Sequence, residues 1–349
     1  MWRWTKRIAI AVLVLAIAVV LLGVFVRYQG VQYVAAYTWG GFANPLPAAD
    51  AYPTENNAGE NPCASGPLTV MTYNIFNGSA LVEALVERFA EGDLDGFRPW
   101  SERVPEIRER IAGYDPDLIG FQEMGADADV LAAVPETPPY TLVSYRLGAL
   151  EYGDSALLFK SERFELLDSG QLWLSPCPRL PLAYGFQRRA MIRYVNWAVL
   201  REKDGAFTFL FANTHFDNNG PNKEPSATLF RERITALAQG MPLIATGDFN
   251  SNGTTDRYHR FTGADQEPPL LQNVFTLAKK RLEAQTHGPP RTIAPTDAMI
   301  HPDRRIDNIL VGGPCSVKAT KWTIDARPLK NGEHMSDHDA MIAHLQFEP

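Results

Sequence analysis

Several patterns that mark common protein classes are missing from the sequence. It contains no glycine-rich nucleotide-binding fingerprint, no low-complexity tract and no internal repeat. Positive charge is also in deficit, because 33 lysines and arginines face 40 acidic residues and leave a net charge of −7. An acidic chain has no general attraction for polyanions. Binding of phosphate or nucleic acid would therefore depend on a local patch or on metal ions.

Cysteine is scarce as well. The three cysteines are Cys63, Cys177 and Cys315, and none of them stands in a motif with a partner base. We therefore expect no catalytic cysteine. Outside the cytoplasm, simple arithmetic gives one disulfide and one free thiol, but the sequence does not determine which two cysteines pair.

The chain does have enough apolar residues for a large core. Hydrophobic residues make up 45% of its 349 residues, which suits one large domain or two ordinary ones. The 26 glycines and 26 prolines predict many turns.

The one long uncharged run, Ile8 to Val26, predicts a transmembrane anchor. As a helix it would span roughly 28 Å, about the thickness of the hydrocarbon core of a bilayer. Basic residues precede it, so residues 1–7 are expected to stay cytoplasmic and the rest to lie on the periplasmic or extracellular side. The alternative is a signal peptide that is cleaved to release a secreted protein, although its apolar core is usually only about 7–15 residues long.

The remainder divides into two parts. Residues 27–66 have the mixed composition of a linker without a sustained period. Residues 67–349 are expected to form the globular catalytic domain. Its pattern of many short strands and few helices predicts an α/β sandwich, with two sheets packed face to face and helices outside.

Local patterns predict several elements of this domain. Val104, Ile107 and Ile111 recur at helical spacing with charged residues between them, and residues 226–239 predict a second helix. The turn sequence Lys203-Asp204-Gly205 lies between two apolar runs and predicts a hairpin.

The most informative stretch is Thr-Gly-Asp-Phe-Asn-Ser at residues 246–251. The apolar run before it predicts a short buried strand, and Gly247 lets the backbone approach a ligand closely. Asp248 and Asn250 are two residues apart in an extended segment, so both side chains point the same way. A carboxylate and an amide suit a site that handles water and a phosphate oxygen. Taken alone, however, Asp and Asn after a strand are common turn formers.

Similar polar groups end or interrupt other short apolar strands. Strand ends in one layer are where functional sites are built, so these groups are candidates for a shared site. The candidates are Asn74, Glu123, His215, Asp248, Asn250, Asp307, Asp337 and His338.

Six stretches that carry these residues resemble, in order, the endonuclease/exonuclease/phosphatase superfamily. They are MTYNIFNG, IGFQEM, NTHFDNN, TGDFNS, RIDNILV and MSDHDAM. The superfamily includes deoxyribonuclease I, abasic-site endonucleases, inositol-polyphosphate 5-phosphatases and neutral sphingomyelinases. The resemblance implies a four-layer α/β/β/α sandwich with the active site at one edge of the two sheets.

The resemblance also implies a bound Mg²⁺ or Mn²⁺ ion. Glu123 would be its chief ligand, and Asn74 and Asp337 would support it. Hard oxygen ligands and a substrate phosphate suit Mg²⁺, which keeps several of its waters.

Catalytic roles follow from the same resemblance. Asp248 would orient or deprotonate the attacking water, and Asn250 would hold that water or a phosphate oxygen. His338, paired with Asp307, would contact the phosphate. His215 would be a second phosphate contact or would donate a proton to the leaving oxygen.

Three residues are predicted to bind substrate: Asn74, Arg193 and Asn218. Arg193 flanks a strand that brings a basic residue near the scissile phosphate in many family members, and Asn218 could equally be a loop cap.

The sequence thus predicts a membrane-anchored phosphoric ester hydrolase, with a phosphodiesterase acting on nucleic acid as the first hypothesis. The alternatives are a phospholipid or sphingomyelin phosphodiesterase, or a phosphomonoesterase, of the same superfamily. A non-catalytic binding domain is a third hypothesis, against which the complete set of motif residues argues. The expected partners are a phosphoester substrate and, through the N-terminal helix, a membrane; no protein partner is predicted.

Overall fold

The computed structural model describes residues 12–23, 63–89, 99–147, 150–179, 183, 185–186, 191–205, 207–218, 220–266, 269–283, 305–333 and 335–349. The predicted cytoplasmic tail and most of the predicted linker lie outside these residues.

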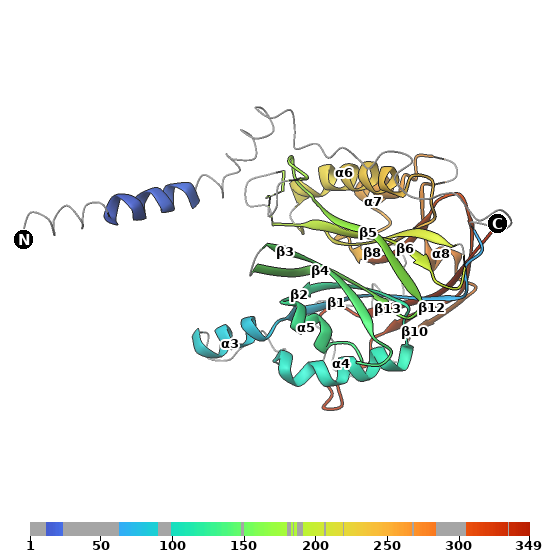
Figure 1. The fold of residues 1–349 in the computed structure, drawn as a ribbon, viewed down its shortest axis with the longest axis horizontal. Helices are drawn as coiled ribbons and strands as arrows, with labels where there is room; N and C mark the ends of the chain where they lie inside the picture. Colours follow the sequence, from blue (N-terminus) through green and yellow to red (C-terminus); the bar gives the residue numbers. More distant parts are fainter. Residues whose placement is uncertain are drawn as a thin grey trace, which may run out of the picture.

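Two mixed sheets form the centre of the domain (Figure 1). The first has seven strands, in the order β10 (Lys280–Glu283), β12 (Ser316–Asp325), β13 (Ala340–Glu348), β1 (Leu68–Gly78), β2 (Leu118–Met124), β4 (Leu150–Lys160) and β3 (Tyr140–Leu147). The second has six, in the order β5 (Phe164–Trp173), β6 (Tyr194–Glu202), β7 (Thr208–His215), β8 (Leu243–Asp248), β11 (Asp307–Gly312) and β9 (Leu271–Asn273). The predicted hairpin is confirmed, because β6 and β7 pair antiparallel.

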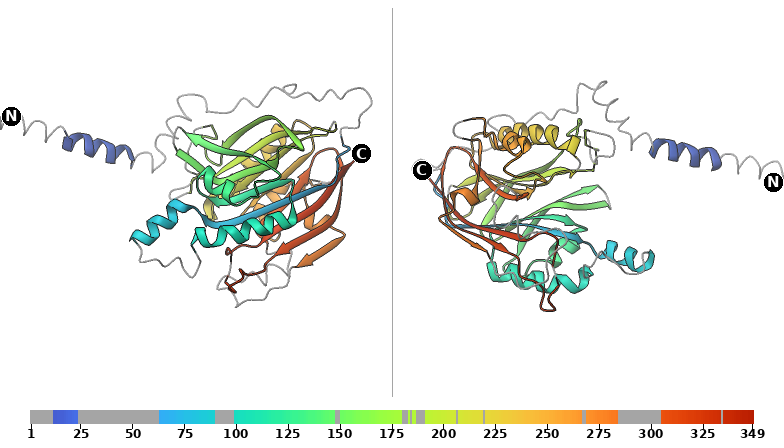
Figure 2. Two further views of the ribbon diagram at one scale, coloured as in Figure 1. Left: turned by 60° about the horizontal axis from the view of Figure 1, so that its bottom comes forward. Right: turned by 180° about the vertical axis from the view of Figure 1, so that it is seen from behind.

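Helices cover the outer face of each sheet (Figures 1 and 2). On the side of the first sheet lie α3 (Ala80–Phe89), α4 (Trp100–Tyr114) and α5 (Asp127–Ala132). On the side of the second lie α6 (Gly220–Ala238) and α7 (Asp256–Thr262), and the short α8 (Val274–Leu277) follows β9. The two sheets and their flanking helices confirm the predicted sandwich architecture.

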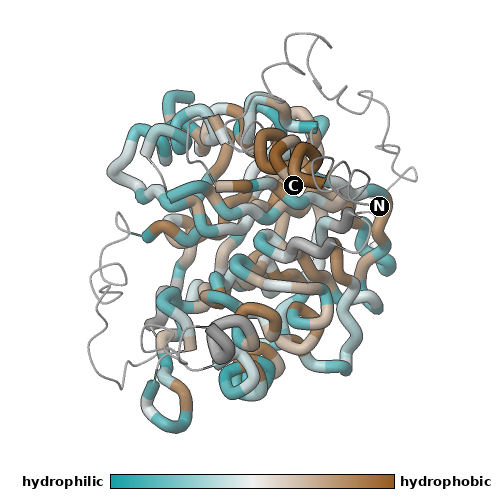
Figure 3. The backbone as a smooth tube through the Cα atoms, turned by 90° about the vertical axis from the view of Figure 1, so that its left-hand side faces the viewer, coloured by the Kyte–Doolittle hydropathy of each residue, from teal (hydrophilic) through white to brown (hydrophobic). Residues whose placement is uncertain are grey.

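Among the described residues, three large hydrophobic cores lie between these layers. Leu68 and Val70 of β1 pack into the core between the two sheets, whereas Met71 and Tyr73 of the same strand pack into the core beneath α4. Successive side chains of a strand point to opposite faces, so a strand that is covered on both faces is apolar at nearly every position. The third core lies between the second sheet and helices α6 and α7. Figure 3 shows hydrophobic segments running through the body of the molecule, with hydrophilic ones at its outer turns.

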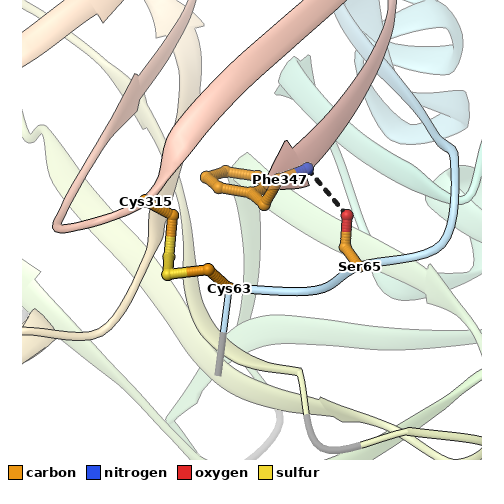
Figure 4. Close-up of a disulfide and its surroundings, with 4 residues drawn as sticks. All are labelled: Cys63, Ser65, Cys315 and Phe347. Carbon is orange, nitrogen blue, oxygen red and sulfur yellow. Dashed lines mark hydrogen bonds between the residues drawn. A yellow bond between two sulfur atoms is a disulfide. The ribbon is translucent and has the colours of Figure 1, made fainter. Parts of the chain in front are cut away.

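A disulfide fastens the start of the domain. Cys63 is bonded to Cys315, and Ser65 next to it accepts a hydrogen bond from the backbone N–H of Phe347 at 2.8 Å (Figure 4). Cys177 is buried and takes no part in a disulfide, so the predicted count of one disulfide and one thiol is confirmed. The disulfide and this hydrogen bond join residues 63 and 65, which precede the predicted boundary at residue 67, to the domain.

Residues 12–23 form a helix whose large apolar side chains are 49–66% exposed. Within the described residues, no helix is both long enough and apolar enough to cross a membrane. The rest of the predicted anchor, residues 8–11 and 24–26, lies outside the described part of the chain, so the anchor remains a prediction.

Candidate active site

The pairing of three strands in the second sheet sets out one half of the site. Strand β8 pairs with β7 so that Asp248 lies opposite His215, and with β11 so that Asp248 lies opposite Asp307. Three adjacent strands therefore present an imidazole and two carboxylates side by side.

The first sheet supplies the other half. Asn74 of β1 pairs with Gln122 of β2, so Glu123 follows directly at the end of the neighbouring strand. Strand β4 carries Asp154, and the segment before β13 carries His338. Contacts between Asn74 and Asp248 and between Asp154 and His215 join the two halves.

Local packing fixes the strand ends. A side chain at Gly247 would place its Cβ only 2.3 Å from the carbonyl oxygen of Thr214, so glycine is required for β7 and β8 to lie this close. Phe216 and Phe249, which follow His215 and Asp248, pack against each other with ring centroids 5.2 Å apart. Both rings also contact Phe261 of α7. The apolar neighbours of the two polar residues thus anchor their backbone.

Asp248 lies at the centre of the cluster of polar side chains that forms the candidate active site. Its Oδ1 accepts a hydrogen bond from the backbone N–H of Asn250 at 2.8 Å, and its Oδ2 accepts one from Asn74 Nδ2 at 3.2 Å. The Nε2 atoms of His215 and His338 lie 3.4 Å and 3.7 Å from the same Oδ2. Burial alone would raise the pKa of Asp248, but the two imidazoles and the N–H donors outweigh it and hold the pKa below its usual range. The carboxylate is therefore ionised at neutral pH.

Asp307 orients His338, as the resemblance implies. Its Oδ2 lies 2.7 Å from Nδ1 of the imidazole, which leaves Nε2 directed toward Asp248. Burial would lower the pKa of His338, but the carboxylates of Asp307 and Asp248 raise it well above its usual value. Burial in turn raises the pKa of Asp307 to about 6, against the opposing effect of His338.

A second carboxylate–imidazole pair lies on the other side of Asp248. Asp154 Oδ1 lies 3.0 Å from Nδ1 of His215, and its Oδ2 accepts a hydrogen bond from Arg193 at 2.6 Å. All three side chains are buried. Burial would raise the pKa of Asp154, but Arg193 and His215 outweigh it and hold the pKa far below its usual range. Arg193, predicted to bind substrate, thus pairs with a carboxylate inside the cluster.

Asn74 joins the predicted metal ligand to Asp248. Its Nδ2 donates to Glu123 Oε1 at 3.3 Å as well as to Asp248, while its Oδ1 accepts from the backbone N–H of Phe76 at 3.1 Å. In this orientation Asn74 presents its amide hydrogens to the two carboxylates. The other Glu123 oxygen accepts from the backbone N–H of Asn77 at 3.3 Å.

The donor set fits a hard divalent cation. Oxygens of Glu123 and Asp248 lie within 3.3 Å of one amide nitrogen, and one ligand atom each from Asp248, Asp307 and His338 lies within 4.8 Å of the others. Asp307 Oδ1 is buried and, among the described residues, has no hydrogen-bond partner. Buried carboxylate oxygens that lack a donor are often explained by an ion. Oxygen-rich sites of this kind suit Mg²⁺ or Mn²⁺.

The remaining predicted residues lie at the margin of the cluster. Asn250 donates from its side chain to the carbonyl of Phe216 at 2.9 Å, and Lys223 donates to the Asn250 carbonyl at 2.8 Å. Asp337 Oδ1 is 4.0 Å from His338 Nε2. Asn218 is exposed, and no hydrogen bond in the described structure joins its side chain to the cluster.

Sequence reasoning missed Asp154 and Ser336. Asp154 lies inside strand β4, where a short polar run gave little indication of function, although a carboxylate beside the buried run Ala156–Phe159 was a usable signal. Ser336 donates to the carbonyl of Asn74 at 2.7 Å and accepts from the backbone N–H of His338 at 3.1 Å. It therefore joins β1 to the segment before β13 within the first-sheet half of the site.

A sandwich in which carboxylates and two oriented imidazoles converge at one edge is the arrangement of a phosphoesterase. The chain belongs to the Endonuclease/Exonuclease/phosphatase family, whose model matches residues 71–338. The resemblance of the six motifs is thereby confirmed. Members of this family are phosphoesterase hydrolases and generally depend on a divalent metal. No curated protein matched the chain.

Solved structures share the fold. A family protein from Bacteroides thetaiotaomicron has a TM-score of 0.63 at 24% identity, over 81% of this chain and 96% of its own. A mannosyl-6-phosphatase from the same organism has a TM-score of 0.62 at 26% identity, over 80% of this chain and 100% of its own. D. rerio TDP2, complexed with a single-strand DNA product, has a TM-score of 0.54 at 16% identity, over 81% and 100%.

Proposed function

We propose that the protein is a divalent-metal-dependent hydrolase of phosphodiester bonds in nucleic acid, tethered to a membrane and facing the periplasm or the cell exterior. The observation that carries the proposal is the meeting of Glu123, Asp248 and His338 at one edge of the two sheets, with Asn74 between the two carboxylates. A binding module would not need this combination of an ionised carboxylate and two oriented imidazoles.

The side chains have distinct roles in hydrolysis. Asp248, held ionised, orients the attacking water and accepts its proton, while Asn250 holds the water or a phosphate oxygen. His338 donates from Nε2 to a phosphate oxygen, because its Nδ1 is engaged by Asp307. His215, whose Nδ1 is engaged by Asp154, supplies a proton from Nε2 to the leaving oxygen as the P–O bond breaks. A cation bound near Glu123 would neutralise phosphate charge and stabilise the leaving oxyanion.

The charge balance of the site favours a diester. Its carboxylates are Glu123, Asp154, Asp248, Asp307 and Asp337. Its cations are fewer, because Arg193 is paired with Asp154, and His338, whose pKa is raised, lies against Asp307 and Asp248. A phosphodiester group carries one negative charge, but a phosphomonoester carries about −1.5 to −2 at neutral pH. The group with less charge is opposed less strongly by the acidic surroundings.

A phosphomonoesterase is the second candidate. The mannosyl-6-phosphatase is 26% identical over its whole length, compared with 16% for TDP2. This similarity supports a small phosphorylated substrate, in which case the bound cation would have to offset the larger charge.

The position of the chain entry supports a soluble substrate over a lipid. The chain enters the domain at Cys63, beside the start of β1, whereas Asn74 lies near the other end of that strand. At about 3.3 Å per residue, Leu68 and Asn74 are roughly 20 Å apart. A membrane tether that joins the domain at Cys63 would therefore be attached to the end of the sandwich opposite the active site.

Two observations support the location. The Cys63–Cys315 disulfide is of a kind that persists in oxidising compartments outside the cytoplasm. The apolar side chains of helix 12–23 are exposed, and a helix that is apolar on all sides is stable only when buried, for example in a membrane.

A substrate panel tests the proposal. The full chain in detergent is assayed with plasmid DNA, RNA, mannose 6-phosphate and sphingomyelin, in Mg²⁺ and in excess chelator. We expect Mg²⁺-dependent cleavage of nucleic acid that is lost in Asp248→Asn and kept in Asp204→Asn, a charge-matched control in an exposed turn. Hydrolysis of mannose 6-phosphate alone would favour the second candidate. Full activity in chelator, or in Asp248→Asn, would refute the chemistry.

A further inference from the structure

Arg103 of helix α4 is one of the most deeply buried charged residues in the described structure, with 1% of its surface exposed. Burying a guanidinium is costly unless its N–H groups find acceptors. The guanidinium also lies 5.6 Å from the ring centroid of Trp100, at the start of the same helix. Its burial therefore calls for a specific reason.

The acceptors are carbonyl groups from two active-site segments. One segment is the β1 end, residues 74–77, and the other is the β13 approach, residues 335–338. Arg103 donates to the carbonyls of Ile75 at 2.7 Å, Phe76 at 2.7 Å and Asn77 at 3.3 Å. It also donates to the carbonyl of Met335 at 2.6 Å. A planar fork of donors can serve several acceptors at once, which a lysine ammonium cannot do in the same geometry.

The β1 end needs such support. The pairing of β1 with β2 is interrupted between Asn74 and Gly78, so the carbonyls there leave the regular ladder. Phe76 and Asn77 have φ angles of 55° and 49°, in the left-handed region that non-glycine residues seldom occupy. Strain of this kind persists only where the surroundings hold it in place.

The backbone that Arg103 holds in turn positions the proposed metal-binding groups. The N–H of Phe76 fixes the Asn74 amide, and the N–H of Asn77 binds Glu123. On the other side, Met335 precedes Ser336, whose hydroxyl bridges the Asn74 carbonyl and the His338 N–H. One side chain thus contacts the backbone of both segments.

We propose that Arg103 is a positioning residue that locks the β1 end to the β13 approach and so sets the spacing between Glu123 and Asn74 on one side and Asp337 and His338 on the other. This inference rests on the proposed function for its effect on metal binding, but the locking of the two segments is independent of that function.

The first test compares Arg103→Lys with Arg110→Lys. Arg110 is a matched control because it lies on the same helix and donates to two loop carbonyls, those of Arg327 and Pro328, away from the site. Mn²⁺ binding to the full chain is measured by electron paramagnetic resonance, and amide hydrogen exchange is measured by mass spectrometry. We expect Arg103→Lys to weaken Mn²⁺ binding about 10- to 100-fold, the range typical of groups that support metal ligands, and to speed exchange in both segments together. Arg110→Lys should change neither.

Other outcomes have definite meanings. Unchanged Mn²⁺ affinity in Arg103→Lys, or faster exchange confined to α4 or to one segment, would refute the positioning role even if thermal stability falls. If the wild-type protein binds no Mn²⁺, the proposed metal dependence fails, whereas the exchange data still test the lock. If Arg103→Lys does not fold, native-state hydrogen exchange of the wild-type protein is measured in added denaturant instead. The lock predicts that the amides of Asn77 and His338 open with one common free energy of opening. Two different opening free energies would refute the lock.

Discussion

The substitution Asp154→Asn tests whether the His215 imidazole must be oriented by a carboxylate, and not only buried, for catalysis. Asp154 accepts hydrogen bonds from both His215 and Arg193 through its two oxygens. Asparagine keeps the shape but has one oxygen, and that oxygen will face the charged Arg193 because a guanidinium has only donors. The NH₂ group then faces Nδ1 of His215, which must become an acceptor. The proton of the neutral ring is thereby moved to Nε2, beside Asp248.

The expected fall in kcat follows from the weakened role of His215 in proton transfer. His215 then lacks the carboxylate at Nδ1 that supports the ring when it is charged, so its part in proton transfer is impaired. General acid–base groups contribute about 10²–10⁴-fold to rates, and we expect kcat to fall about 10²–10³-fold, equivalent to roughly 3–4 kcal/mol. KM should change much less, because substrate contacts remain.

Single-turnover kinetics with a double-mutant cycle provide the assay. If Asp154 acts through His215, Asp154→Asn combined with His215→Ala should be no slower than His215→Ala alone. A near-normal kcat for Asp154→Asn, or losses that multiply in the double variant, would refute the reasoning.

The same substitution has a consequence for stability. Removing one charge of a buried ion pair lowers the free energy of unfolding by about 3–5 kcal/mol. Because the asparagine oxygen still faces Arg193, we expect a loss at the lower end of this range, about 3 kcal/mol. Because folding lowers the pKa of Asp154 below its unfolded value of about 4, its stabilisation is present above that pH and is lost as pH falls. The stability difference between wild type and variant should therefore shrink below about pH 4. Asp325→Asn, at a buried carboxylate paired with Arg327 away from the site, should lower stability without lowering kcat.

Three further predictions concern the scaffold and the tether. Phe249→Ala should lower the free energy of unfolding by about 3–5 kcal/mol in urea titration, because it removes a ring from the cluster beneath Asp248; a loss below about 1 kcal/mol would contradict this packing role. Replacing Cys63 and Cys315 by serine should cost about 2–5 kcal/mol in thermal unfolding yet leave kcat unchanged, since the bond lies at the far end of β1; a large fall in kcat would show that the two ends are coupled. Protease added outside intact cells should cut between residues 27 and 62 and release an active domain, whereas full protection would reverse the proposed orientation.

Much of the fold could be predicted because its signals are local. The apolar runs that became β1, β2 and β8 are short and end at polar residues, and the spacing of Ile107 and Ile111 marked the buried face of α4. These patterns depend only on which face of its own strand or helix each side chain occupies. The pairing of Cys63 with Cys315 depends on residues far apart in the chain meeting in space, and no local pattern contains that information.

The site was predicted less completely, because some of its contacts also join residues that are far apart in the chain. Asp154 acquires its role from the packing of β4 in the first sheet against β7 in the second, which brings it to His215. Arg103 lies in a predicted helix with charges between apolar positions, where a charge is normally solvated; only the irregular backbone of β1 gives it acceptors. Residues whose partners are backbone groups of distant segments leave little trace in the sequence.

Anomalous diffraction from crystals of the protein soaked in Mn²⁺ tests directly whether a divalent cation binds between Glu123 and Asp248. We expect a single strong peak at the edge where the sheets meet, about 2.0–2.2 Å from a carboxylate oxygen of Glu123 and close to Asp248, with weaker density after Glu123→Gln. A fully active protein whose Mn²⁺ peaks all lie away from Glu123, Asp248 and His338 would contradict it.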